Sequence, residues 1–411
     1  MSNIPKIRFP GFTDDWEQRK LNEYLVVSKE KNKNEVYGKE DVLSVSGDYG
    51  IVNQIEFQGR SFAGVSVAPY GVVETGDVVY TKSPLKSNPY GIIKTNKGKP
   101  GIVSTLYAVY KPLDNVFPEF VQIYFEQDAR MNNYMHPLVN KGAKNDMKVS
   151  DENALKGEVC FPCRDEQIKI SEFFTKLDNL ITLHQRKCDS IKKIKKCMLQ
   201  KMFPKKGEKV PEIRFPGFTD DWEQRKLYEI ADKAVDNRGK TPAISEDGTH
   251  PLLEVASLGN GTPDYSKVTK YLSDETFETE LRAYIKEGDI LFSTVGSIGL
   301  VSLMDANENA AIAQNIVAFR ANEKYDSKFL YAMLSTEDNQ YKAQRIVMGA
   351  VQPSIKVSQL VDVEYCVTEN IDEQRKLGDF FINLDNLITL HQRKCEKLKE
   401  LKKGMLQKMI V

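Results

Sequence analysis

The sequence predicts an α+β protein with two mixed α/β domains, joined by two long antiparallel coiled-coil helices in a pseudo-two-fold arrangement. Three observations predict this fold. The 411-residue chain contains two copies of one unit of about 200 residues. Each copy ends in a helical stretch whose apolar residues repeat every 3.5 positions, and the middle of each copy mixes strand and helix patterns.

Two blocks recur without a change: IRFPGFTDDWEQRKL at 7–21 and 213–227, and LDNLITLHQRKC at 177–188 and 384–395. We call the two copies of the repeat segment and of the long helix together the frame. Drift after duplication scatters changes evenly, whereas here whole blocks are spared and the intervening inserts diverge. The predicted segments are a repeat segment (1–21), insert one (22–164), a central helix and linker (165–209), a second repeat segment (210–227), insert two (228–371) and a C-terminal helix (372–411).

The two predicted helices carry apolar residues that step by four and three, the seam pattern of a coiled coil. Asp165 and Asp372 are the predicted N-caps. Two such seams can satisfy each other, so we expect an intramolecular antiparallel pair. The predicted seam residues are Phe173, Leu177, Leu180, His184, Ile191, Ile194 and Met198 in the first copy and Phe380, Leu384, Leu387, His391, Leu398, Leu401 and Met405 in the second.

Polar residues also occur at or beside this seam. His184 and His391 occupy equivalent positions, where a polar residue fixes the register of a coiled coil. A metal site is the alternative, but no other ligand types cluster beside them. The run 192–196 places Ile194 on the seam and its lysines outward, as a solvated face or a docking surface for a protein or a phosphate backbone.

The inserts are predicted to share a fold while differing in surface. Each contains a Gly-Asp turn followed by a strand, at 76–81 and 288–293. Further predicted elements are strands at 102–110 and 311–319 and helices at 118–131 and 327–346.

Composition excludes several classes of protein. Lys+Arg and Asp+Glu are 58 each, which argues against a self-sufficient polybasic nucleic-acid binder. The charges are unevenly distributed: 165–209 has 12 basic and 6 acidic residues, and insert two has 13 and 22. The sequence lacks a signal peptide, a membrane span of about 18 apolar residues, and the cysteines of a disulfide scaffold. A cytoplasmic protein without a membrane partner is predicted.

A search for catalytic motifs finds only fragments. Gly239-Lys240-Thr241 resembles the end of a P-loop, but Ala234 replaces its first glycine. Asn88-Pro89-Tyr90 lacks the second proline of the amino-methyltransferase loop, and Cys160-x-x-Cys163 has no second pair for zinc. The prediction is a binding protein with no catalytic residues, no metal site and no cofactor of its own.

The repeated motifs resemble the specificity (S, or HsdS) subunits of type I restriction–modification systems. The resemblance rests on the FPGFTDDWEQRKL openings, the Asp-Glu-Gln helix starts at 165–167 and 372–374, the Gly-Asp strands and the Arg-Gly-Lys-Thr-Pro motif at 238–242. It covers the whole chain, and two frames with divergent inserts are its most specific part. Insert one lacks the 238–242 motif.

The resemblance implies a non-catalytic adaptor for adenine methylation and restriction. Each insert would be a target-recognition domain for one half of a bipartite, asymmetric DNA site. The helices would set the spacer and dock two methyltransferase (M) subunits, which bring S-adenosylmethionine. Restriction (R) subunits would add cleavage that requires ATP and Mg²⁺.

Polar loop residues are the predicted contacts with double-stranded DNA, because lysine and arginine bind phosphates and Gln352 can pair with adenine. Each could instead be an ordinary loop residue. The candidates are Lys82, Ser83, Lys86, Asn88, Lys141, Lys144 and Lys148 in insert one and Arg238, Lys240, Thr294, Ser297, Gln352 and Lys356 in insert two. Alternative functions are a stand-alone DNA methyltransferase with fused specificity domains and a coiled-coil scaffold with no nucleic-acid role.

Overall fold

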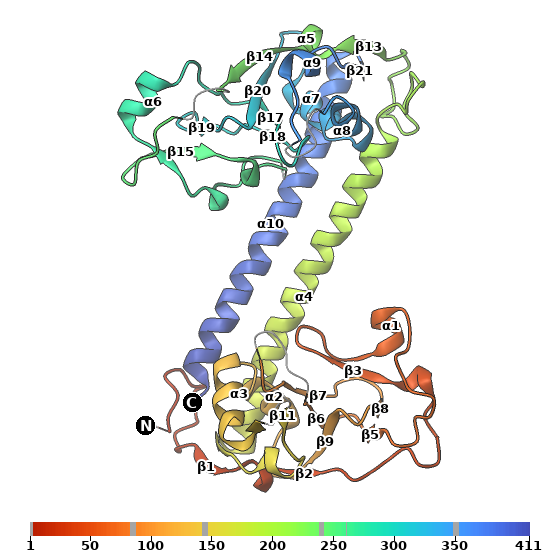
Figure 1. The fold of residues 1–411 in the computed structure, drawn as a ribbon, viewed down its shortest axis with the longest axis vertical. Coiled ribbons are helices and arrows are strands. Elements are labelled where there is room, and N and C mark those ends of the chain that lie inside the picture. Colours follow the sequence, from red (N-terminus) through yellow and green to blue (C-terminus); the bar gives the residue numbers. More distant parts are fainter. Residues whose placement is uncertain (1–2, 83–87, 142–146, 238–241, 260, 348–352) are drawn as a thin grey trace. The chain divides into compact units, whose positions relative to one another are not determined.

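The computed structural model describes residues 3–82, 88–141, 147–237, 242–259, 261–347 and 353–411. The chain divides into two compact units, which we call unit 1 (Met1–Thr182 with Glu396–Val411) and unit 2 (Leu183–Cys395). Two long helices, α4 (Arg164–Lys201) and α10 (Ile371–Met409), contribute residues to both units. Two β-rich domains with a packed pair of long helices confirm the predicted α+β class (Figure 1). Within the described ranges, no helix has the length and apolar character needed to cross a membrane.

Unit 1 is built on a four-stranded antiparallel sheet in the order β2-β9-β6-β7. Its strands are β2 (Leu25–Val27), β9 (Tyr107–Pro112), β6 (Val78–Thr81) and β7 (Ile93–Thr95). The smaller strand pairs are β1 (Glu17–Lys20) with β12 (Glu158–Phe161), β3 (Leu43–Ser46) with β4 (Gly50–Asn53), β5 (Gly71–Val73) with β8 (Gly101–Val103), and β10 (Asn140–Lys141) with β11 (Met147–Lys148). The short helices are α1 (Gln54–Gln58), α2 (Pro118–Tyr124) and α3 (Asp128–Met135).

Unit 2 contains a comparable four-stranded antiparallel sheet, β14-β20-β17-β18. Its strands are β14 (Ala231–Asp236), β20 (Ile316–Ala321), β17 (Ile290–Ser293) and β18 (Val301–Leu303). The other strands are β16 (Tyr271–Leu272), β15 (His250–Leu253) and β19 (Ala311–Ile312), and the pair β13 (Glu223–Lys226) with β21 (Glu364–Val367). The short helices are α5 (Leu227–Ile230), α6 (Asp274–Glu280), α7 (Ser327–Leu334), α8 (Glu337–Gln344) and α9 (Val357–Leu360).

Each unit has a large aromatic core that includes part of both long helices. Trp16 lies in the core of unit 1 with Leu177 of α4 and Leu406 of α10. Trp222 lies in the core of unit 2 with Met202 and Phe381. Each core thus contains one of the two tryptophans of the chain, and each tryptophan is 1% exposed.

The Gly-Asp motif forms the turn before the central strand of each sheet. Gly76 and Gly288 have φ of 93° and 83°, a conformation that favours glycine. The carboxylate of Asp77 accepts the main-chain N–H of Glu74 at 2.8 Å, and Asp289 accepts that of Lys286 at the same distance. The motif therefore has a structural role.

The frame makes the same contacts in both units. β1 pairs with β12 as β13 pairs with β21. The Arg8 guanidinium binds both carboxylate oxygens of Glu166 at 2.7 Å, and Arg214 binds Glu373 at 2.6 and 2.8 Å. Both glutamates are fully buried, so one buried ion pair in each unit joins a repeat segment to the start of a long helix.

Two glutamines attach the inserts to the frame. Gln167 Oε1 accepts the main-chain N–H of Phe117 at 2.8 Å, and Gln374 Oε1 accepts that of Asp326 at 2.7 Å. Each amide group donates in turn to a main-chain carbonyl, of Pro162 and of Thr368 respectively. Both glutamine side chains are buried.

Several predicted elements are shorter than expected. The strands at 102–110 and 311–319 are each divided into two, β8 with β9 and β19 with β20. The helices at 118–131 and 327–346 are each divided into α2 with α3 and α7 with α8. In the second case Thr336 caps α8 by accepting the N–H of Asn339, so a new helix starts where the apolar pattern is continuous.

The N-cap prediction is also wrong by one or two positions. α4 begins at Arg164 and α10 at Ile371, so Asp165 and Asp372 lie within the first turns. At the second helix Asn370 accepts the N–H groups of the following residues and is the cap.

Within each unit α4 and α10 pack antiparallel, as predicted (Figure 1). In unit 2 the Nδ1 atoms of His184 and His391 lie 2.9 Å apart, and Cys188 Sγ lies 4.0 Å from the carbonyl oxygen of Ile388. Burial, followed by the charges of His184 and nearby lysines, lowers the pKa of His391. The two histidines that the sequence places at equivalent seam positions thus face each other between the helices in unit 2.

The predicted seam register is wrong at four positions. Leu180, Ile194, Leu387 and Leu401 are 43–48% exposed. The side chains one position later are buried or half-buried: Ile181, Lys195, Ile388 and Lys402. A pattern of apolar seam residues predicts that Ile194 and Leu401, and not the lysines that follow them, face the other helix. The lysines face inward instead because they bind carboxylates. The other predicted seam side chains are buried or half-buried: Phe173, Leu177, His184, Ile191, Met198, Phe380, Leu384, His391, Leu398 and Met405.

Candidate nucleic-acid interface

In unit 1 the loop after β6 lies near the segment that follows the β10–β11 hairpin. The Lys82 ammonium forms an ion pair with Asp151, three residues beyond the end of β11. Lys141 and Lys148 lie on the two paired strands of the hairpin, opposite Met147 and Asn140. The structure therefore places Lys82 beside the segment that follows this strand pair, about 70 positions further along the sequence.

In unit 2 the loop after β17 pairs with the segment before α9. Val295 forms an antiparallel bridge with Ser354, and the N–H of Ile355 donates to Thr294 O at 2.9 Å. Ser297 and Lys356 on these two segments are both exposed. As in unit 1, the loop that follows the central strand meets a later polar segment, so the two inserts present candidates at comparable places.

Two predicted contact residues are structural instead. Asn88 is 6% exposed and donates from Nδ2 to Asp128 Oδ1 at 2.7 Å. Thr294 is fully buried, and its N–H donates to Asn315 O at 2.8 Å. Neither side chain is accessible to a base edge in this conformation. Six further candidates lie outside the described residues: Ser83, Lys86, Lys144, Arg238, Lys240 and Gln352.

An exposed aromatic surface on unit 1 was not predicted. Tyr49, in the turn between β3 and β4, is 69% exposed, and Phe57 of α1 is 46% exposed; their ring centroids lie 5.3 Å apart. The guanidinium of Arg60 lies 4.6 Å from the centroid of the Phe62 ring, which is 55% exposed. Aromatic and arginine side chains can stack on bases. The available signal was a short run of aromatics among Gly, Ser and Arg, without the period of a core strand or helix.

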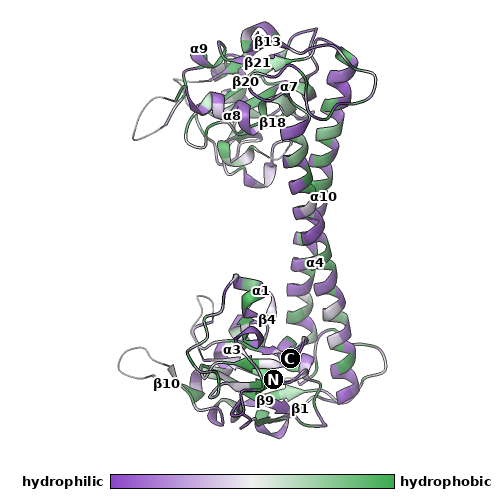
Figure 2. Cartoon of the chain, turned by 90° about the vertical axis from the view of Figure 1, so that its right-hand side faces the viewer, coloured by the Kyte–Doolittle hydropathy of each residue, from purple (hydrophilic) through white to green (hydrophobic). Residues whose placement is uncertain are grey.

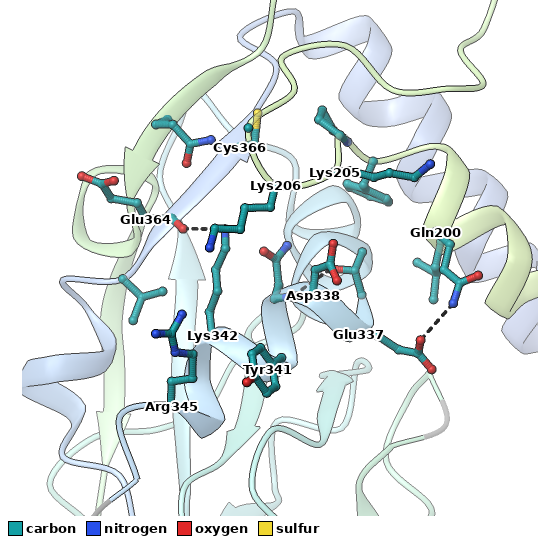
Figure 3. A pocket seen from close by; sticks show the side chains of 18 of the residues that line it. Gln200, Lys205, Lys206, Glu337, Asp338, Tyr341, Lys342, Arg345, Glu364 and Cys366 are labelled. Carbon is teal, nitrogen blue, oxygen red and sulfur yellow. Dashed lines mark hydrogen bonds between the residues drawn. The ribbon is translucent and has the colours of Figure 1, made fainter.

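A pocket of about 950 Å³ lies in unit 2 between the end of α4, α8 and β21 (Figure 3). Lys342 donates to the main-chain oxygen of Glu364 at 2.9 Å, and burial lowers the pKa of its ammonium group. Gln200 donates to the Glu337 carboxylate at 2.9 Å. Burial raises the pKa of the Cys366 thiol, which disfavours the nucleophilic thiolate. None of the described DNA-contact candidates lines this pocket of mixed charge.

The described residues contain no cluster of three or more His, Cys, Asp or Glu side chains that could hold a metal ion. Cys160 and Cys163 are free thiols. Burial raises the pKa of Cys160.

Comparisons with known proteins agree with the repeated frame. Residues 219–400 match the family model of the type I restriction modification DNA specificity domain. The type I restriction enzyme MjaVIII specificity subunit of Methanocaldococcus jannaschii is 25% identical over 264 residues, 62% of this chain and 61% of that relative. The putative MjaX specificity subunit of the same organism is 22% identical over 437 residues, 99% of this chain and 96% of that relative.

One solved structure shares the fold over the full length of both chains. It is the S subunit of the type I restriction–modification system of M. genitalium, which covers 99% of each chain with a TM-score of 0.62 at 13% identity. The family model covers one repeat, and the other repeat has the same buried ion pair and glutamine contacts. The chain thus matches the type I restriction modification DNA specificity domain over residues 219–400, and it is similar over 99% of its length to a putative type I restriction enzyme specificity subunit.

Proposed function

We propose that this chain reads DNA for a type I restriction–modification complex as its non-catalytic specificity subunit. Insert one (22–164) reads one half of a bipartite, asymmetric site, and insert two (228–371) reads the other half. The observation that carries the proposal is that one frame, with the same buried contacts, holds two inserts of different sequence. Conserving the support while varying what it holds is the arrangement expected of two readers with different targets.

The loop clusters supply the proposed reading surfaces. In insert one these are the region around Lys82 and the β10–β11 hairpin with Lys141 and Lys148. In insert two they are the paired segments with Ser297 and Lys356. The candidates outside the described residues belong to the same two segments of each insert or, for 238–241, follow β14. Ammonium groups position the phosphates, while short polar side chains and amides reach base edges.

The long helices have a separate proposed role. α4 contains 38 residues and α10 contains 39, which at 1.5 Å per residue gives rods of about 57 Å. In our proposal the pair sets the spacer between the half-sites and docks two methyltransferase subunits, which bind S-adenosylmethionine. Restriction subunits then join with ATP and Mg²⁺. Hydrophilic residues recur along both helices (Figure 2), and many of them are exposed and available to these partners.

Charge distribution supports dependence on partners. The net charge is zero and insert two has 22 acidic against 13 basic residues, so phosphate neutralisation by this chain alone is small. The complex is expected to bind DNA far more tightly than the chain alone. The cytoplasmic location predicted from the sequence agrees with such a role.

The test exchanges one insert at a time. Residues 22–164 are replaced by the corresponding insert of another family member, the chimaera is expressed with the methyltransferase subunit, and methylated adenines are mapped across the genome. Only one half of the methylated sequence should change, and the reciprocal exchange of 228–371 should change only the other half.

Expression without the methyltransferase subunit is the control, and it should give no methylation. A change in both half-sites, or in neither, contradicts the assignment of one insert to one half-site. Methyl transfer by the purified chain alone would instead favour a stand-alone methyltransferase.

A further inference from the structure

A buried ion pair links α4 to α10 in unit 2. The Lys195 ammonium binds the two carboxylate oxygens of Asp385 at 2.6 and 2.7 Å, and the two side chains are 14% and 6% exposed. The Tyr331 hydroxyl donates to the same carboxylate at 2.8 Å. Burial, followed by the charge of Asp385, raises the pKa of Tyr331, so this hydroxyl remains a donor.

The equivalent pair in unit 1 has the reverse origin. Here α10 provides the lysine: Lys402 Nζ lies 2.6 Å from Asp178 of α4 and 2.7 Å from Glu126. The Lys402 side chain is 13% exposed. Burial lowers its pKa, but the two carboxylates outweigh burial and raise it. The lysines and the aspartates of the two pairs are each 207 positions apart, so the frame repeats this interaction.

Between the two cores, the apolar residues in the central stretch of the helix pair specify its register only weakly. Residues 177–188 and 384–395 have the same sequence, so α4 and α10 present the same side chains to each other. A slip by one heptad would keep apolar against apolar over much of the interface. It would also move each lysine by about 10 Å and leave buried charges without partners.

We propose that the Lys195–Asp385 and Lys402–Asp178 pairs fix the register of α4 against α10 and thereby determine which spacer length the subunit accepts. The role in spacer selection rests on the proposed function, whereas the role in register does not. Buried ion pairs add little net stability compared with apolar side chains of similar size, but a mismatched buried charge is costly. The two pairs therefore select one register among several apolar solutions.

The sharpest test replaces both pairs by apolar residues. The variant is Lys195→Met, Asp385→Leu, Lys402→Met and Asp178→Leu in the full chain, with Glu126→Gln so that the carboxylate beside Lys402 is not left without its cation. It should remain folded, as judged by tryptophan fluorescence, because apolar replacement of a buried pair is close to neutral. The exposed ion pair of Lys328 with Asp379, at 2.7 Å, receives the same change as a matched control.

Register is measured directly by cross-linking. His184→Cys and His391→Cys place thiols at positions that face each other, in a background where the native cysteines are alanine. A short bis-maleimide should join them efficiently in the parent and in the control. In the apolar variant the yield should fall roughly tenfold, while thiols placed one heptad away gain yield, because several registers are populated.

Spacer choice is measured by mapping methylated adenines with the methyltransferase subunit present. The parent should accept one spacer and the apolar variant several. The charge-exchanged chain, Lys195→Asp with Asp385→Lys and Lys402→Asp with Asp178→Lys, again with Glu126→Gln to avoid a second carboxylate beside position 402, should regain both the cross-link and the single spacer. If the apolar variant unfolds, this exchanged chain decides, and its failure to restore the parent cross-link overturns the proposal.

An unchanged cross-link in the folded apolar variant also overturns the proposal. A changed cross-link with an unchanged spacer overturns the link to spacer choice. Absence of any bipartite methylation by the parent contradicts the proposed function and leaves the cross-link result to decide the register.

Discussion

The ion pair between Arg214 and Glu373 allows a quantitative prediction for unit 2. The guanidinium makes two hydrogen bonds of 2.6 and 2.8 Å to the carboxylate, whose side chain is 1% exposed. Arg214→Ala removes both bonds and leaves the charge of Glu373 buried without its cation. These hydrogen bonds, the largest influence, also raise the pKa of Arg214 in the native state.

The expected loss is about 3–5 kcal/mol of unfolding free energy, the range for breaking a buried pair by removing one partner. With a urea dependence of about 3 kcal/mol per molar, the midpoint of unit 2 should fall by about 1–1.7 M. By contrast Lys196→Ala breaks an exposed pair with Glu337, 64% and 57% exposed, and should cost less than about 1 kcal/mol.

The assay uses the division of the two tryptophans between the cores. In a Trp16→Phe chain the remaining fluorescence comes from Trp222, which is buried in unit 2. Urea unfolding of this chain therefore reports unit 2 without contribution from the core of unit 1. The reciprocal experiment, Arg8→Ala in a Trp222→Phe chain, should give a similar loss in unit 1.

The comparison between variants decides the outcome. If Arg214→Ala lowers the midpoint no more than Lys196→Ala does, the buried pair contributes no more than a surface pair, and the reasoning about the frame is refuted. A normal midpoint in Arg214→Ala/Glu373→Leu would show that the loss in the single variant comes from the unpaired carboxylate.

Three further outcomes are expected. Leu406→Ala should cost unit 1 about 2–5 kcal/mol in Trp16 fluorescence, because this α10 side chain is 6% exposed in its core; an equal loss from an exposed leucine of α10 would contradict this. Burial and the charge of His184 lower the pKa of His391, so the unfolded state takes up the proton first as pH falls. The melting temperature of unit 2 should therefore decrease between about pH 7 and pH 5, and His391→Asn should flatten that decrease. Thr294→Val should destabilise unit 2 by about 1 kcal/mol, because it removes the hydrogen bond that the buried Thr294 hydroxyl donates to Asn315 O at 3.2 Å. Ser297→Ala should leave stability unchanged and weaken methylation of one half-site, and the reverse result for the two variants would contradict these assignments.

The repeated frame and the antiparallel helices were predictable because identical blocks and a 3.5-residue period are visible in one sequence. The phase of the seam was not. The inward orientation of Lys195 depends on Asp385, which is 190 positions away, and the periodicity rule treats every lysine as an outward residue. A local sequence pattern contains no information about a carboxylate that lies on another helix.

In the inserts, too, local features were predictable and contacts between distant segments were not. The Gly-Asp turns predicted the central strands, since glycine and aspartate perform local roles there. The pairing of the loop at Val295 with Ser354 joins segments about 60 positions apart, and the burial of Thr294 follows from its bond to Asn315. Candidate residue types were therefore predictable, but their accessibility was not.

The two glutamines of the frame have a consequence for how such chains diversify. Gln167 and Gln374 hold their inserts through main-chain N–H and carbonyl groups, which nearly every residue type possesses. These two glutamine contacts thus impose almost no side-chain requirement on the insert. A different insert can therefore occupy the place between two frame blocks if its backbone follows the same path and it keeps the side chains that bind the helices, such as Glu126 and Tyr331. Under the proposed function, such an exchange would change the DNA target without a compensating mutation in the helices.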